Sequence, residues 1–381
     1  MKVAEYSYAN RQYTKHENSD LVNDRKVQLV LAFGGKGALA GGGMYEYLRE
    51  QFPVAHIALC STAGEIFHTE VLDNSISVTA IEFDHTHVMS ASVNIGDYPR
   101  SFEAGEALMR KIPDADNLCY IMILSDGGLV NGSELVNGVH TVIQCKVPVT
   151  GGLAGDGAAF ISTVAGLNEE PVSGKILAIG FYSRRLNISH GSLGGWEMFG
   201  PERIVTRSSH NILFELNGEN ALDIYIKYLG RYAEDLPGSA LLFPLSLKLG
   251  DNNGSVVRTI LSIDNERKSM RFAGDVPQGS KARLMKANFD KLIAAASNAA
   301  GQAIAGEATT KPRLALLISC VGRKLILNSR VEEEVDAVHT LLGEGTMLTG
   351  FYSYGEISPL SPGSKCELHN QTMTITTFNE L

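Results

Sequence analysis

Three short turns of similar sequence recur along the chain, and they constrain its fold more than any other feature. Aligned on a glycine followed by an acid, they read STAGE, GLAGD and YSYGE, so that Glu65, Asp156 and Glu356 occupy matching places. Each turn closely follows an apolar segment that predicts a buried strand. An internal repeat of this kind indicates that one supersecondary unit occurs three times in the chain.

The segments around the turns repeat as well. Each turn is preceded by an apolar strand, a helical segment and a second strand, the first strands being predicted at 27–33, 118–124 and 314–320. Strand–helix–strand crossovers with added strands imply mixed sheets with helices packed on them. We therefore predict an α/β (mixed α+β) fold. We also predict two domains, 1–200 and 201–381, because glycine, proline and the only tryptophan cluster near this boundary.

Composition and charge exclude several classes of partner. With 33 basic and 42 acidic residues, the net charge is −9 and no basic stripe is visible. Nucleic acid and anionic membrane surfaces are therefore not expected as partners. The polar first 20 residues lack the apolar core of a secretory signal, and no stretch approaches the ~18 apolar residues of a membrane span. We expect a cytoplasmic protein.

Two glycine-rich segments follow predicted strands. The first, Gly35-x-Gly37, lacks the acid that a dinucleotide fingerprint places after the next strand, so we interpret it as a strand–helix connection. The second contains Gly151, Gly152 and Gly155. Such a segment brings backbone N–H groups close to a ligand or lets two sheets pack tightly, and the sequence leaves both readings open.

Cys60, Ser61 and Thr62 lie on the first turn and could supply a nucleophile. Nucleophilic catalysis needs a base with its own orienting group, and no spacing in this sequence supplies one. We therefore interpret the segment as a strand end whose hydroxyls bond to local backbone, and we predict that the protein is not an enzyme.

Arg323 and two histidines are further candidates for binding. Arg323 follows a predicted strand and could hold a carboxylate bidentately or form an ordinary salt bridge. The ten histidines do not cluster at metal-ligand spacing. Haem requires only one axial histidine, so His68 and His369, beside the first and third turns, remain candidates.

Five segments in order resemble the FIST family over about 27–378. They are ALCSTAGEI (58–66), GGLAGDG (151–157), ALLISCVGR (315–323), LTGFYSYGEI (348–357) and LHNQT (368–372). The resemblance implies an intracellular sensory module that binds small ligands and is elsewhere fused to chemotaxis, kinase or diguanylate cyclase outputs. No kinase or GGDEF-like stretch is visible here, so a separate partner such as a histidine kinase is expected to receive the signal. The resemblance also leaves a homodimer open.

The resemblance suggests two kinds of ligand. Stand-alone FIST proteins include the NosP-type sensors, which bind haem b and detect nitric oxide; His369 or His68 would then be the axial ligand. The alternative is a polar metabolite such as an amino acid, held by Arg323, Glu356 and nearby tyrosines. The predicted ligand site, taken over all turns, comprises Cys60, Ser61, Thr62, Gly64, Glu65, Gly151, Gly152, Gly155, Asp156, Arg323, Gly350, Tyr352, Tyr354, Glu356 and Asn370.

Overall fold

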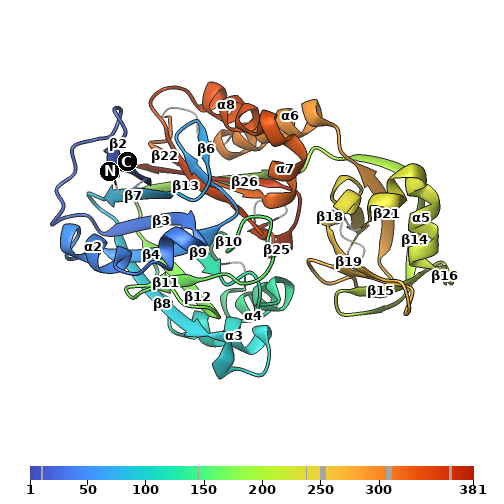
Figure 1. Cartoon of the computed structure of the whole chain (residues 1–381). Coiled ribbons are helices and arrows are strands. Elements are labelled where there is room, and N and C mark those ends of the chain that lie inside the picture. Colours follow the sequence, from blue (N-terminus) through green and yellow to red (C-terminus); the bar gives the residue numbers. More distant parts are fainter. Residues whose placement is uncertain (10–11, 145, 237, 249–254, 306–310, 360–362) are drawn as a thin grey trace.

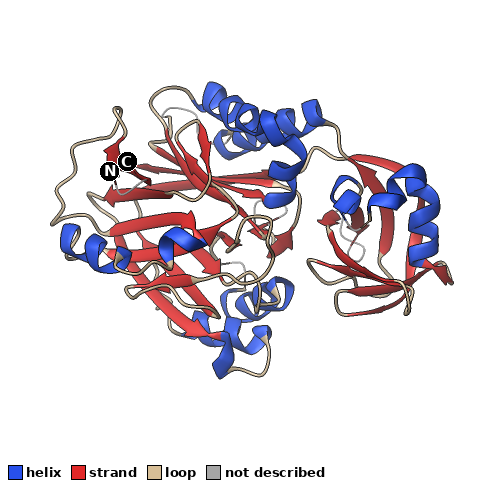
Figure 2. Cartoon of the chain, viewed as in Figure 1, coloured by secondary structure: helices blue, strands red, loops and turns tan. Residues whose placement is uncertain are grey.

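The computed structural model describes the chain except for residues 10–11, 145, 237, 249–254, 306–310 and 360–362. The described residues form three six-stranded sheets and one eight-stranded sheet, with helices packed on the outside (Figures 1 and 2). The six-stranded sheets mix parallel and antiparallel pairs. The predicted mixed α/β fold is therefore confirmed.

Each six-stranded sheet is built on two parallel strands joined by helices. The first repeat has β3 (Leu29–Gly35), α1 (Lys36–Leu39), α2 (Met44–Gln51) and β4 (His56–Thr62). The second has β9 (Leu118–Ser125), α4 (Gly132–Ile143) and β10 (Val149–Leu153). The third has β22 (Leu314–Cys320), α7 (Val321–Leu327), α8 (Val331–Leu342) and β23 (Met347–Ser353). The predicted threefold recurrence of strand–helix–strand units is confirmed.

Further strands complete these sheets on both sides. Antiparallel to the first strand of each pair lie β7 (Ile76–Glu82), β12 (Lys175–Tyr182) and β26 (Met373–Glu380). Beyond them lie β1 (Lys2–Ala9) with β2 (Gln12–Lys15), then β8 (His87–Asn94), and β13 (Leu186–Leu193).

The three repeats exchange strands, so their sheets interlock. The strands β5 (Glu65–Phe67) and β6 (Glu70–Leu72) follow β4 in the chain, but β5 pairs with β23 of the third repeat. Likewise β11 (Ala165–Leu167) pairs with β4, and β24 (Gly355–Pro359), which carries β25 (Cys366–His369), pairs with β10. Each turn therefore leads directly into a neighbouring sheet, which brings the three turns together.

Apolar side chains from all three repeats fill the space between the sheets. Phe33, Tyr120, Ile318, Phe351 and Phe378 are all at most 2% exposed and belong to one cluster. Two further helices, α3 (Ser101–Arg110) and α6 (Phe289–Ile304), cover outer faces of the sheets. Burying this much aromatic surface is the main favourable term that holds the three sheets together.

The eight-stranded sheet forms a separate body, at the right of Figure 1. It contains α5 (Ala221–Leu229) and the strands β14 (Glu197–Ser209), β15 (Ile212–Leu216), β16 (Glu219–Asn220), β17 (Leu245–Lys248), β18 (Ser255–Arg258), β19 (Ile260–Asp264), β20 (Ser269–Phe272) and β21 (Lys281–Lys286). The chain enters this body after β13 and leaves it before α6. The division into domains 1–200 and 201–381 stays a prediction. The strands β13 and β26 lie on either side of the predicted boundary and pair along their whole length.

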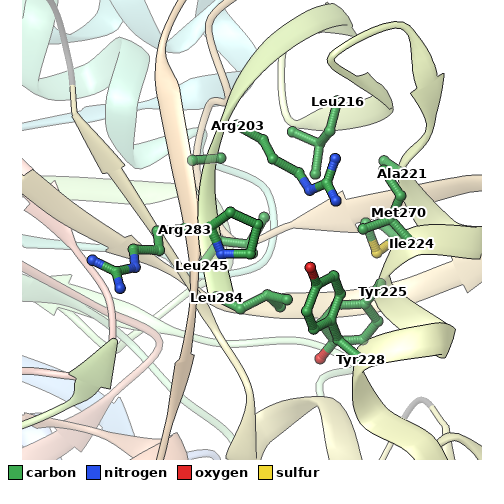
Figure 3. Close-up of a pocket in the computed structure, with 12 residues that line it drawn as sticks. Arg203, Leu216, Ala221, Ile224, Tyr225, Tyr228, Leu245, Met270, Arg283 and Leu284 are labelled. Carbon is green, nitrogen blue, oxygen red and sulfur yellow. The ribbon is translucent and has the colours of Figure 1, made fainter. Parts of the chain in front are cut away.

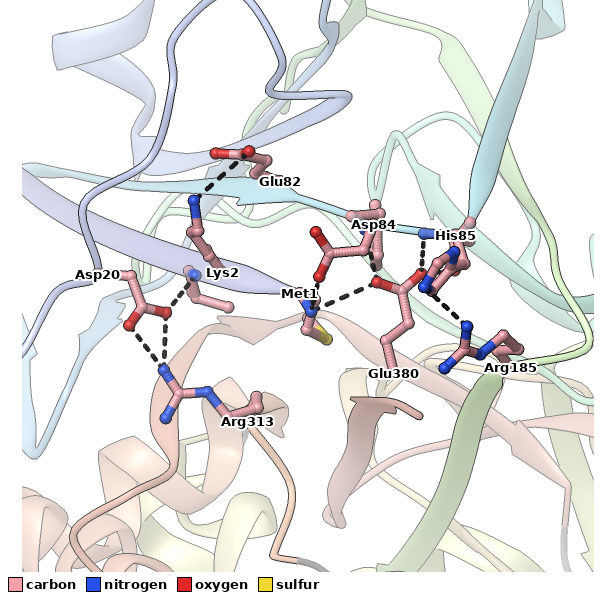
Figure 4. Close-up of polar contacts among 12 residues, drawn as sticks. Met1, Lys2, Asp20, Glu82, Asp84, His85, Arg185, Arg313 and Glu380 are labelled. Atoms are coloured by element: carbon pink, nitrogen blue, oxygen red, sulfur yellow. Dashed lines mark hydrogen bonds and ion pairs between the residues drawn. The ribbon is translucent and has the colours of Figure 1, made fainter.

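Polar contacts join both ends of the chain to the three-sheet body (Figure 4). The Glu380 carboxylate accepts hydrogen bonds from the backbone N–H groups of Asp84 (2.6 Å) and His85 (2.9 Å). Arg313 pairs with Asp20 at 2.7 Å. These contacts connect the start of the first repeat, the link to the second repeat and the last strand of the third.

No helix in the described part of the chain is long and apolar enough to cross a membrane.

Candidate functional site

The three turns lie side by side and are linked by backbone hydrogen bonds. The Ala63 N–H donates to the Tyr352 carbonyl (2.8 Å), and the Gly155 N–H donates to the Ser61 carbonyl (2.9 Å). The Tyr354 N–H donates to the carbonyl of the residue two places before Gly155 (3.1 Å). The matching turns of the sequence therefore meet in one region.

The acids of the first and third turns have the same hydrogen-bond environment. Glu65 accepts from Thr62 Oγ1 (2.5 Å) and from the Ser75 backbone N–H (3.1 Å) and hydroxyl (2.7 Å). Glu356 accepts from the Ser353 hydroxyl (2.7 Å). It also accepts from the backbone N–H (3.1 Å) and hydroxyl (2.8 Å) of the residue before β26, Thr372. Both side chains have no exposed surface.

Burial governs the ionisation of these two acids. Removing a carboxylate from water disfavours its charge, and hydrogen bonds to the carboxylate oppose that effect. Burial raises the pKa of Glu65, and it raises the pKa of Glu356 to about 8 despite the bonds from Ser353 and Thr372. Glu356 is therefore largely protonated at neutral pH, and it joins strands without carrying a full charge.

Asp156 of the second turn is used differently. Its carboxylate accepts hydrogen bonds from the backbone N–H groups of Phe160 (2.8 Å), Ile161 (2.9 Å) and Ser162 (2.8 Å), and from the Tyr354 hydroxyl. Burial raises the pKa of Asp156, but these bonds outweigh it, so the pKa lies below its usual value. Asp156 thus fixes the loop that follows it.

The glycines at the second and third turns allow backbones and sheets to pack closely. This favours the tight-packing interpretation over the one in which backbone N–H groups face a ligand. Gly151 and Gly350 have φ values of +158° and +154°, and a Cβ on either would collide with the carbonyl oxygen of the facing strand. A Cβ on Gly152 would press against Ile318, and one on Gly155 against the Ala63 backbone. Each of these glycines permits a close approach of two backbones or sheets.

Arg323 and Tyr352 both bind a buried carboxylate of the protein itself. The Arg323 guanidinium contacts Glu334 through Nε (3.0 Å) and Nη2 (2.6 Å), and it donates to the carbonyls of Gly194 and Leu292. The Tyr352 hydroxyl donates to the same Glu334 at 2.7 Å. Because Arg323 and Glu334 have no exposed surface, this is a structural ion pair, the second of the two alternatives.

Three other predicted site residues are also enclosed. Cys60 is fully buried, and burial raises the pKa of its thiol, which disfavours the nucleophilic thiolate. The Ser61 hydroxyl accepts a bond from the Val164 N–H at 3.0 Å. Asn370 donates to the Tyr354 carbonyl (3.4 Å), and its buried Oδ1 has no hydrogen-bond partner among the described residues.

A cavity of about 290 Å³ opens beside the first turn. It lies at the carboxyl ends of the parallel strands β3 and β4, where Gly35 and Thr62 are paired. Ligands of α/β proteins bind outside the carboxyl ends of parallel strands, where the connecting loops diverge. Its lining residues are Gly35, Lys36, Gly37, Thr62, Ala63, Gly64, Glu65, Asp73, Asn74, Asp156, Gly157, Ala159 and Ile161.

The cavity includes only part of the predicted site. Thr62, Gly64, Glu65 and Asp156 line it, whereas the remaining predicted residues lie elsewhere around the three turns. Sequence reasoning missed Lys36, Asp73 and their neighbours. The sequence signal for this cavity was Gly35-x-Gly37. We interpret it above as a strand–helix connection, but it also forms part of the cavity wall.

Charges of both signs surround this cavity. The Lys36 ammonium donates to the Ser162 hydroxyl, and no ion pair of Lys36 is found among the described residues. Asp73 lies on the segment beside Gly35 and pairs with Lys324, whose ammonium also donates to the Ala63 carbonyl at 2.9 Å. The rim can therefore meet both an anionic and a cationic group of one small molecule.

A second cavity lies within the eight-stranded body (Figure 3). Tyr225, Tyr228 and Arg203 line it, among other residues, between α5 and the sheet. Its volume is about 10 Å³, room for about one water molecule. This cavity is a packing defect and is too small for a metabolite.

The surroundings of the two candidate haem ligands do not fit a haem. His369 is 4% exposed, its Nε2 lies 3.0 Å from the Ser358 carbonyl, and burial lowers its pKa to about 4. The His68 ring lies between those of His16 (4.3 Å) and His339 (4.8 Å). Neither histidine lines the cavity at the first turn or the cavity in the eight-stranded body, whereas a haem needs a large apolar slot beside its ligand.

These features define a class of protein: a threefold α/β repeat whose turns meet at a cavity, with an additional body inserted in the third repeat. The FIST N domain matches residues 28–219 and the FIST C domain matches residues 221–359. The chain therefore belongs to the FIST family, which is a family of sensory domains. A comparison with curated proteins found no match.

Two solved structures resemble the chain over most of its length. One is described as cyanuric acid hydrolase from A. caulinodans, with 9% identity, a TM-score of 0.33, and coverage of 94% of this chain and 91% of the other. The second, "Cyanuric acid hydrolase: evolutionary innovation by structural concatenation", has 10% identity, a TM-score of 0.35, and coverage of 100% and 99%.

The prediction that the protein is not an enzyme is corrected by these comparisons. Both resembling structures are hydrolases, so exclusion of an enzyme does not stand. At 9% and 10% identity and TM-scores of 0.33 and 0.35, the likeness assigns no activity to this chain.

Proposed function

We propose that this FIST protein senses a small polar metabolite, such as an amino acid, which binds in the cavity at the carboxyl ends of β3 and β4. The observation that supports the proposal is the cavity lining, which includes the opposite charges of Lys36 and Asp73. An amino acid carries a carboxylate and an ammonium group, which Lys36 and Asp73 complement. Thr62 and the adjacent turn supply neutral polar contacts.

Ligand binding would be reported through the turns. The cavity is bounded by segments of the first and second repeats, and the third repeat is bonded to the same turn through Tyr352. A ligand shifts such a structure only by its different affinity for two arrangements. We propose that the changed arrangement is read by a separate partner, such as a histidine kinase in the cytoplasm.

Thermal-shift measurement against the twenty amino acids, followed by calorimetric titration of the hits, tests the proposal. A ligand that binds only the folded protein raises Tm by mass action. We expect at least one hit whose affinity falls about tenfold or more in Lys36→Met. Lys227→Met, on the exposed face of α5, is the matched control and should bind normally. A panel without hits, or hits unaffected by Lys36→Met, would overturn the proposal.

Haem-based sensing of nitric oxide is the alternative, and an absorption spectrum decides between the two. Protein produced with a haem precursor should lack a Soret band if the metabolite proposal is right. A stoichiometric Soret band that shifts when nitric oxide is added would replace it with the haem proposal.

A further inference from the structure

One cluster of ligating side chains lies outside the cavity at the first turn. Glu5, His16 and His68 each place a carboxylate oxygen or ring nitrogen within 4.8 Å of the others. Glu5 lies on β1, His16 directly follows β2, and His68 lies in the turn between β5 and β6. Three separate chain segments therefore bring their ligating atoms to one point.

The state of Glu5 suggests that a cation belongs there. Its side chain has no exposed surface, and neither carboxylate oxygen has a hydrogen-bond partner among the described residues. Leaving a buried carboxyl group without partners costs several kcal/mol. By contrast, the buried acids Glu65 and Glu356 each receive three hydrogen bonds. Glu5 is thus the exception among these buried acids.

The histidines are also available as ligands. The buried Nδ1 of His68 has no hydrogen-bond partner among the described residues. Among the described residues, the one hydrogen bond that the His16 ring accepts comes from the Asn18 N–H, at a long 3.3 Å. The His339 ring on α8 lies 4.8 Å from that of His68, but its Nε2 faces the Glu344 carboxylate at 3.8 Å, so His339 lies beside the three clustered residues without belonging to the cluster.

We propose that Glu5, His16 and His68 bind a zinc ion, with a water molecule completing its coordination. A carboxylate combined with imidazoles suits Zn²⁺, whereas Mg²⁺ and Ca²⁺ prefer oxygen ligands alone. Ligand atoms in tetrahedral zinc sites lie about 3.4 Å apart, so the side chains must close by on the order of 1 Å. The backbones of Glu5 and His16 are already held together, since the His16 N–H donates to the Glu5 carbonyl at 2.9 Å.

Such an ion would tie the N-terminal strands to the third repeat. The β5–β6 turn carrying His68 is held against β23, and its His68 N–H donates to the Leu348 carbonyl at 3.0 Å. Glu5 and His16 belong to the N-terminal segment. Binding energy at a site formed only in the folded chain is added to its folding stability. Zinc would therefore stabilise the packing of the first sheet on the third.

The test is titration of the metal-stripped full chain with zinc sulfate, followed by calorimetry and melting. We expect one zinc ion per chain and a raised Tm. Cobalt(II) should give the visible absorption typical of tetrahedral nitrogen and oxygen coordination. Glu5→Gln and His68→Asn should weaken binding about 100-fold or more, since even outer-shell changes cost 10–100-fold.

The variants are chosen so that loss of binding is separable from loss of folding. Glu5→Gln keeps the shape of the side chain, and its metal-free Tm should equal or exceed that of the wild type. His68→Asn removes the imidazole, and asparagine tolerates the positive φ of +53° at this position. His210→Asn, at φ +49° in the eight-stranded body, is the matched control and should bind zinc normally. Absence of stoichiometric binding, or binding that survives both Glu5→Gln and His68→Asn, would overturn the proposal.

Discussion

The first and third repeats share one framework but differ in what stands at the ends of their parallel strands. Glu65 and Glu356 have the same three hydrogen bonds from matching positions. In the first repeat a cavity opens beside this acid, whereas in the third a buried ion pair of Arg323 with Glu334 follows the first strand. The repeats thus share one backbone framework, and a few side chains after the first strand of each repeat determine whether a cavity opens there.

The strongest way to break this comparison is to remove the charge that seals the third repeat. Arg323→Met leaves Glu334 buried without its partner and should lower the free energy of unfolding by about 3–5 kcal/mol. Lys36→Met, at the open end of the first repeat, should change it by only about 0.5 kcal/mol. Urea denaturation of both variants measures the difference.

A double variant provides the control for this prediction. Replacing both charges, in Arg323→Met with Glu334→Leu, should recover most of the lost stability, because the unpaired buried charge is gone. Equal stabilities of Arg323→Met and Lys36→Met would contradict the distinction between a sealed and an open repeat.

The pH dependence of stability distinguishes the two buried acids. Since the pKa of Glu356 rises from an ordinary 4.5 to about 8 on folding, the folded protein binds the proton more tightly. The folding stability that comes from proton binding at Glu356 is therefore fully present below pH 4.5 and is lost as the pH rises through about 8. Glu356→Gln should remove this decline, which is of the order of 3 kcal/mol between pH 5 and 9.

Glu65→Gln is the matched variant in the first repeat. Its pKa is also raised by burial, so its removal should flatten the same decline, but by less. Denaturation midpoints of both variants between pH 5 and 9 give the two slopes. A free energy of unfolding that increases between pH 5 and 9 in the wild type, but not in Glu356→Gln, would contradict this prediction.

Equivalent glycines sharpen the comparison further. Gly37 and Gly322 both lie two residues after the first strand of their repeat. A Cβ at Gly37 meets nothing within 4 Å, whereas one at Gly322 presses on the buried Gln371 amide. Gly322→Ala should cost about 1–3 kcal/mol, and Gly37→Ala about 0.5 kcal/mol or less. Thermal melting compares them, and equal losses would refute a difference in packing.

The smallest expected effect concerns the loop beside the open cavity. Tyr354→Phe removes the hydroxyl bond to Asp156 but keeps the ring stacked on Phe160, whose centroid lies 4.6 Å away. The free energy of unfolding should fall by about 1 kcal/mol. Ligand affinity should fall as well, since this loop carries three cavity residues, Gly157, Ala159 and Ile161. A loss of stability with unchanged affinity would show that the loop does not contribute to binding.

Sequence reasoning succeeded where a pattern is local. The Gly–acid turns follow the same strand in each repeat, so their recurrence predicted the threefold unit. It failed where contacts join distant segments. The exchange of β5, β11 and β24 between sheets has no sequence signal, and neither does the meeting of His16 with His68.

Buried polar residues were the other source of error. The sequence left open whether Arg323 binds a ligand carboxylate or forms a salt bridge, and only the structure shows its buried partner Glu334. Glu5 occupies an inward position of β1, where an alternating pattern predicts an apolar side chain. Only the three-dimensional structure shows which partner offsets the free-energy cost of burying such a side chain.

Thiol labelling of an equivalent pair of variants tests the central claim most directly. Gly37→Cys and Gly322→Cys would each be treated with a small thiol reagent, with the wild-type rate subtracted. We predict rapid labelling of folded Gly37→Cys, slowed by a saturating amino-acid hit, and labelling of Gly322→Cys only as fast as the protein unfolds. Equal rates for the two variants, or no protection of Gly37→Cys by the ligand, would contradict an open ligand cavity in the first repeat and a sealed third repeat.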